Sequence, residues 1–80
     1  MLMITIIEKN DKQLDLKEMQ KIVGGLIQVH PEKVKINNKH FEVIVNEEGW
    51  VNELPFNQML SEMFDIEVAG TAILLEGGLK

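Results

Sequence analysis

The sequence predicts a small α+β domain with a mainly antiparallel sheet and two helices on one face of that sheet. Apolar patterns typical of strands alternate with two patterns of helical period, in the order β-α-β-β-α-β. The 80 residues suffice for one domain and are too few for two, so residues 1–80 are expected to form a single domain. A ferredoxin-like arrangement is one solution with this order, although order alone does not fix strand pairing.

The first part of the chain predicts a strand, a helix and a second strand. The β-branched, apolar run at 2–8 is typical of a strand. Asp15 is expected to cap a helix, because Glu18 completes a capping-box pattern three positions later. Gly24-Gly25 should end this helix, since glycine accepts the left-handed conformation found there. Residues 26–30 then predict a strand that ends at the following proline.

A hairpin is expected in the middle of the chain. The strand at 40–46 alternates clearly between apolar and polar residues, and a short strand at 34–36 precedes it. Asn37-Asn38 suits the tight turn between them. After a turn at 47–49, Trp50-Val51 is a candidate for a short returning arm.

The last part predicts a helix and a final strand. Pro55 suits the first turn of the helix and Asn57 suits its cap, and both remain open as its start. The last strand is expected over 66–76, with a break or bulge near Gly70. Five apolar residues at helical spacing are expected to face the core: Phe56, Met59, Leu60, Met63 and Phe64.

The first and last strands have apolar residues on both faces. If two short helices cover one face of the sheet, the other face needs a second cover, which another subunit would supply. We therefore expect the chain to associate with copies of itself. The alternative is that apolar residues at the strand ends are simply exposed, as is common in proteins.

The composition argues against several classes of function. The net charge is −5, with eight lysines and no arginine, which disfavours general nucleic-acid binding. Without cysteine the chain forms no disulfide and no thiolate metal site. No apolar run is long enough to span a membrane, and no secretory signal is visible, so we expect a cytoplasmic protein without membrane contact.

Few residues suit catalysis or metal binding. Ser61 has no base nearby in the sequence, and no phosphate-loop or nucleophile motif occurs. His30 and His40 flank a loop and form the one acid–base pair available, which keeps a small enzyme open as an alternative. The three glutamates within 47–53 match no metal-binding loop. We therefore expect a protein without enzymatic activity, metal or cofactor.

Two local features favour ligand contact. Three lysines between the two histidines form a positive patch on a negative chain, although an ordinary solvated loop explains them too. The single tryptophan follows a turn and suits stacking on a base or anchoring a partner, or else packing over the core edge. Glycine-rich turns also bring backbone N–H groups close to phosphates. The residues expected to contact an anionic ligand are Lys33, Lys35, Lys39, His40, Trp50, Gly24 and Gly25.

Four short motifs occur in a fixed order: Val23-Gly24-Gly25, Val45-Asn46-Glu47-Glu48-Gly49, Leu54-Pro55-x-Asn57 and Ile66-x-x-x-Gly70. With these motifs in this order, the chain resembles a family of small proteins of unknown function from bacteriophages and conjugative plasmids. The resemblance implies a mobile-element protein that acts inside a bacterium. By analogy with other small proteins of that kind, it also suggests action against host defence, for example by trapping a nucleotide signal.

The leading hypothesis is thus a non-enzymatic mobile-element protein that oligomerises and binds a small anionic ligand such as a nucleotide. One alternative is an interaction module that blocks a host protein through an apolar patch near Trp50. A second alternative is a small enzyme that uses His30 or His40.

Overall fold

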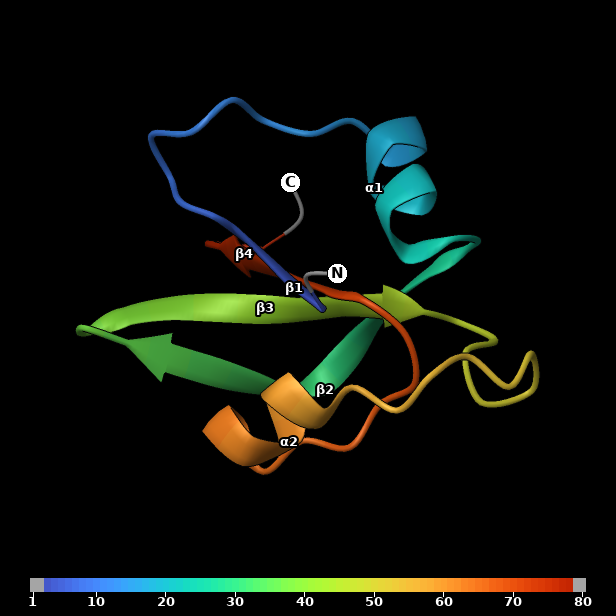
Figure 1. Cartoon of the computed structure of the whole chain (residues 1–80). Coiled ribbons are helices and arrows are strands. Elements are labelled where there is room, and N and C mark those ends of the chain that lie inside the picture. The colour runs from blue at the N-terminus through green and yellow to red at the C-terminus, as the bar shows by residue number, and fades with distance from the viewer. Residues whose placement is uncertain (1–2, 79–80) are drawn as a thin grey trace.

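The α+β class and the order β-α-β-β-α-β are confirmed by the computed structural model, which describes residues 3–78 (Figure 1). Four strands form one mixed sheet in the order β1-β4-β3-β2. The elements are β1 (Ile4–Ile7), α1 (Leu16–Val23), β2 (Ile27–Ile36), β3 (Lys39–Asn46), α2 (Gln58–Phe64) and β4 (Ala72–Glu76).

The sheet is mostly antiparallel, as expected. The last strand, β4, lies inside it, antiparallel to β3 and parallel to β1. Leu74 stands opposite Ile6 on one side and Val43 on the other. This central place explains why β4 is apolar on both faces, because a strand buried on both sides shows a continuous hydrophobic run.

The two helices cover opposite faces of the sheet, so the prediction of two helices on one face was wrong (Figure 1). Val43 and Leu74 pack in the cluster that contains Leu60 of α2. Ile44 and Ile73 point the other way, into the cluster under α1. Successive strand residues face opposite sides, so each face of the central strands needs its own cover. A ferredoxin-like arrangement with both helices on one face is therefore excluded.

This arrangement removes the reason for expecting self-association. That expectation assumed that one face of the sheet would stay bare. Each face instead receives a helix from the same chain. Self-association itself stays an untested prediction.

Helix α1 begins and ends as its sequence predicts. The Asp15 side chain accepts a hydrogen bond from the Glu18 amide at 2.8 Å, and the Glu18 side chain accepts from the Asp15 amide at 3.2 Å. Both halves of the capping box are therefore present. Gly24 closes the helix with φ of 83°, in the left-handed region.

Strand β2 is longer than predicted because it continues through Pro31. Its pairing with β3 shifts register between Val29 and Lys33, around that proline. β2 is an edge strand, where proline's missing N–H need not cost a ladder bond. The predicted turn at Asn37-Asn38 is confirmed, and both residues have positive φ.

Helix α2 starts at Gln58, with Asn57 as its cap. Only Leu60 of the five apolar residues is fully buried, and Phe64 is half-buried against the same cluster. The expectation that all five face the core was therefore wrong. Leu60 and Phe64 lie one turn apart on the side of the helix that faces the sheet. Each successive residue is rotated by about 100° around the helix axis, so the positions beside these two point in other directions. The remaining three side chains are exposed: Phe56, Met59 and Met63.

Candidate functional site

The residues expected to contact an anionic ligand do not converge. Ile36 pairs with Lys39 at one end of the β2–β3 ladder, whereas Asn46 and the loop that holds Trp50 lie at the other end (Figure 1). Lys35 pairs with His40, close to the hairpin turn. The length of β3 therefore separates the basic residues near the turn from the indole.

The lysines also differ in direction and in partners. Val34 points into the cluster under α2, so Lys33 and Lys35 point to the other face of the sheet. Lys39 forms an ion pair with Glu8, with 3.1 Å between Nζ and Oε2. The hydrogen bond and the charge of Glu8 raise the pKa of Lys39 above its usual range. Lys39 already has a carboxylate partner.

Gly24 and Gly25 have a helix-closing role. Their amides both donate to the carbonyl of Gln20, at 2.8 and 3.0 Å, so neither points at an empty phosphate site. The Asn46 side chain donates to the Val23 carbonyl at 3.1 Å. A Cβ at Gly25 would lie 2.9 Å from the Asn46 side chain, so glycine allows this close approach. The first two sequence motifs thus join the end of α1 to the turn after β3.

Asn57 joins the other two motifs. Its side chain is fully buried, and its Oδ1 accepts a hydrogen bond from the Leu60 amide at 3.0 Å. Its Nδ2 donates to the carbonyls of Met3 and Gly70, at 2.8 and 2.9 Å. One amide group therefore caps α2 and attaches it to the start of β1 and to the turn before β4. This role is structural, and an N-cap signature alone does not reveal its two long-range bonds.

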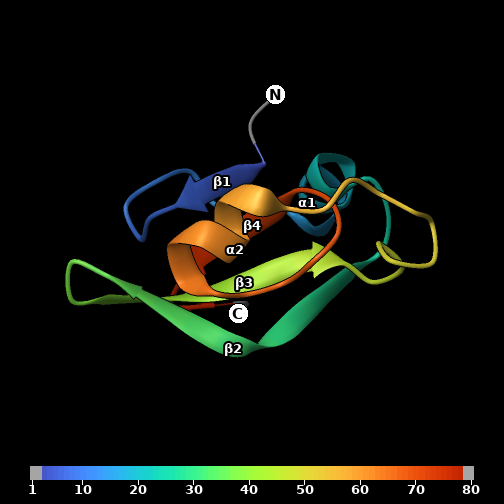
Figure 2. The same ribbon diagram turned by 60° about the horizontal axis from the view of Figure 1, so that its bottom comes forward.

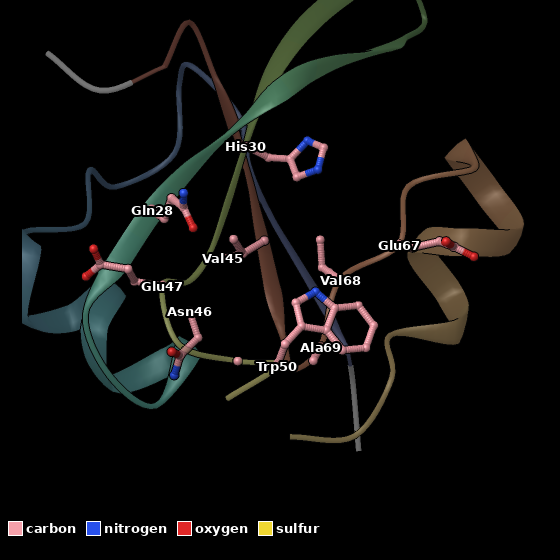
Figure 3. A pocket seen from close by; sticks show the side chains of 10 residues that line it. Gln28, His30, Val45, Asn46, Glu47, Trp50, Glu67, Val68 and Ala69 are labelled. Atoms are coloured by element: carbon pink, nitrogen blue, oxygen red, sulfur yellow. The ribbon is translucent and has the colours of Figure 1, made fainter. Parts of the chain in front are cut away.

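A cavity of about 130 Å³ lies beside Trp50 (Figure 3). Val45 and Val68 form its floor, with the Trp50 indole and the His30 imidazole beside them (Figure 3). His30 Nδ1 accepts a hydrogen bond from the Glu32 amide at 3.1 Å, so the neutral ring carries its proton on Nε2.

The charges around this cavity disfavour an anion. Glu47 and Glu67 are the charged residues among its lining, and no lysine lines it. A second cavity of about 210 Å³ lies between the end of α1 and the turns before α2 and β4. Its lining has no charged residue. Apart from the His30 imidazole, the lining of neither cavity offers a basic side chain to a phosphate.

The two histidines do not form one catalytic site. His40 pairs with Lys35 near the hairpin, whereas His30 lies in the register shift of β2, several residues along the strand. Within residues 3–78, no group of three or more histidine, aspartate or glutamate side chains is placed to hold a metal.

An exposed apolar surface lies on α2 and the loop before it. The sequence suggested an apolar patch near Trp50, but it assigned Phe56, Met59 and Met63 to the core. We call this set the α2 surface: Trp50, Val51, Phe56, Met59 and Met63. Trp50 is 62% exposed, Val51 78% and Met63 56%. The expected returning arm at 50–51 does not form, because these residues lie in turns. The Trp50 and Phe56 rings contact each other, with centroids 6.2 Å apart. Figure 2 brings α2 toward the viewer, and no other helix or strand covers its outer side.

Residues 3–78 match a family model described as a domain of unknown function, DUF3846. The chain belongs to the DUF3846 family. No curated protein and no solved structure matches it. None of the helices formed by the described residues of this DUF3846 chain is long and apolar enough to cross a membrane.

The charge of the DUF3846 chain is divided unevenly along its sequence. From residue 40 to residue 79 there is no lysine or arginine, yet eight of the thirteen acidic residues lie there. Three of these, Glu53, Glu62 and Asp65, are exposed and lie within two residues of Val51 or Met63 in the sequence. The α2 surface is therefore apolar with an acidic rim. This uneven charge was readable from the sequence, but the exposure of the apolar residues was not.

Proposed function

We propose that this DUF3846 protein is a non-enzymatic interaction module that binds a partner protein through the α2 surface. The observation that carries the proposal is the concentration of large exposed apolar side chains within residues 50–63. Single exposed apolar residues are ordinary, but clusters mark interaction sites. Tryptophan, phenylalanine and methionine are also enriched at the centres of protein interfaces.

The local structure supports this use of the surface. Trp50 and Phe56 already contact each other, so this aromatic pair is partly ordered before a partner binds. Met59 and Met63 lie one turn apart on α2, and methionine adapts its shape to irregular surfaces. Leu60 on the inner side anchors the helix to the core. The surface is thus carried on a packed element.

The resemblance to small bacteriophage and plasmid proteins supplies the proposed setting. In that setting the chain acts in the cytoplasm of a bacterial host and blocks a host protein, for example one used in defence. Nucleotide trapping is the weaker candidate, because the fold separates the basic residues from Trp50 and directs Lys33 and Lys35 away from α2.

Site-specific photocrosslinking tests the proposal. A photoreactive residue replaces Met63 in one variant and Leu16 of α1 in the other. These side chains are similarly exposed, at 56% and 53%, and lie on opposite sides of the sheet. We expect crosslinks to a discrete partner protein from position 63 only, in the cells that naturally express the chain. Equal products from both positions, or none from position 63, would contradict the proposed function.

A further inference from the structure

We infer that the partner segment bound by the α2 surface is basic and amphipathic, with lysine or arginine beside its apolar residues. This inference rests on the proposed function and names the chemistry of the partner. It follows from the charges around the surface, which the apolar residues alone do not determine.

Three carboxylates form the acidic rim of the α2 surface. Glu62 lies beside Met63 on α2, Asp65 caps the end of that helix and Glu53 lies between Val51 and the helix. All three carboxylates are on exposed residues. Their negative charges attract a cationic segment and help to orient it, while the apolar centre supplies contact area.

Lysines beside this rim would neutralise it, but the placed lysines lie elsewhere. Lys33 and Lys35 point to the opposite face of the sheet, and Lys39 is paired with Glu8 near the hairpin. Lys17 and Lys21 lie on α1, which covers that opposite face as well. None of these five lysines lies beside the three carboxylates, so none of them neutralises the rim.

The possible occupants of the α2 surface differ in charge. A second copy would bring two acidic rims together, and like charges at an interface are unfavourable. An anionic membrane, a nucleic acid or a nucleotide would meet the same repulsion. A basic amphipathic segment alone matches both the charge and the apolar character of the surface.

The experiment uses three synthetic peptides and the full chain. The first peptide forms a helix with lysine on one side and leucine on the other. The second has glutamate in place of every lysine, and the third has the composition of the first in an order that gives no apolar side. Trp50 is the single tryptophan of the chain, so its fluorescence reports directly on this surface.

We expect only the first peptide to bind and to shift Trp50 emission to shorter wavelength. Its affinity should fall as salt rises from about 0.01 M to about 1 M, because the screening length falls from about 30 Å to about 3 Å. The substitution Met63→Ser should abolish the shift, and Leu16→Ser should preserve it.

Charge variants test the rim directly. The double substitution Glu53→Gln and Glu62→Gln removes two charges of the rim and should weaken binding about fivefold at low salt, because one exposed ion pair usually contributes about two- to threefold. The control is Glu18→Gln on α1, which covers the other face of the sheet; glutamine keeps an acceptor for the capping box, and the affinity should change by about twofold or less.

Several outcomes would overturn the inference. Equal binding of the acidic peptide would remove the role of charge but leave apolar docking at position 63 intact. Equal binding of the third peptide, which has the same composition but no apolar side, would mean unspecific charge attraction. An emission shift that depends on protein concentration alone would place a second copy on the surface. Loss of the position-63 crosslink is the separate result that removes the proposed function itself.

Discussion

Replacing Asn57 tests how the fold is held together at the end that carries the α2 surface. Asn57→Ala removes three side-chain hydrogen bonds in a fully buried place: one from the Leu60 amide and two to the carbonyls of Met3 and Gly70. Asn57→Ser keeps a cap oxygen for the amide of Leu60 but loses both long-range bonds. The pair of variants therefore separates capping from attachment.

The magnitude follows from these contacts. At about 1 kcal/mol for each bond, Asn57→Ala should lower the free energy of unfolding by about 3 kcal/mol. Asn57→Ser should lower it by about 2 kcal/mol, because the cap contributes about 1 kcal/mol. A domain of this length has a total stability of about 4–12 kcal/mol. The alanine variant should therefore lose a quarter or more of it.

Asn57→Asp adds a test with a definite pH dependence. Aspartate keeps the cap oxygen but places a carboxylate against the carbonyl oxygens of Met3 and Gly70. Burial and these oxygens should raise its folded pKa above the unfolded value of about 3.9. The charged carboxylate therefore destabilises the fold fully at a pH above the folded pKa, and this loss of stability shrinks as the pH falls through that pKa. The free energy of unfolding of the aspartate variant should therefore rise relative to that of Asn57→Ala as the pH falls.

Urea unfolding followed by Trp50 fluorescence and circular dichroism gives the required free energies. The exposed Asn52 supplies the control, and Asn52→Ala should stay within about 0.5 kcal/mol of the parent chain. An Asn57→Ala variant as stable as the Asn52→Ala control, with an unchanged denaturant slope, would refute the reasoning. It would mean that the three bonds contribute nothing net to folding.

Three further predictions concern the core, a close approach and an ion pair. Leu60→Ala should cost about 2–5 kcal/mol in urea unfolding, since Leu60 is fully buried, and a cost below about 1 kcal/mol would contradict that burial. Gly49→Ala should cost about 1–3 kcal/mol by the same measurement, because the added methyl would meet the backbone carbonyl of Ala69. Glu8→Gln should lower the pKa of Lys39 in an NMR titration, because the Glu8 charge and hydrogen bond raise it. The raised pKa also means that the pair stabilises the fold below the ordinary lysine pKa and loses its effect as the pH rises through the raised value.

The sequence correctly predicts the local features that depend on neighbouring residues. The capping box at Asp15 and Glu18, the helix end at Gly24 and the turn at Asn37-Asn38 all occur as expected. Each is decided by backbone conformation and hydrogen bonds within a few residues, so the residue types in that short segment are enough to predict it.

The candidate site was predicted less well, because it depends on which side of α2 meets the sheet. The spacing of apolar residues marked Met59 and Met63 as core, as it marked Leu60. A helix of two turns rests on the sheet along one narrow side, so its flanking apolar residues stay exposed. The carboxylates of the acidic rim beside them can be read directly from the sequence.

The sequence by itself determined the element order, the two ends of α1, the apolar strands and the excess of carboxylates after residue 40. The tertiary structure alone decided that β4 lies between β1 and β3, and that α1 and α2 cover opposite faces. The physical reason is that strand pairing joins residues far apart in the chain, such as Ile4 and Ala72. Burying both faces of the central strands then requires one helix on each side, which leaves the outer side of α2 exposed.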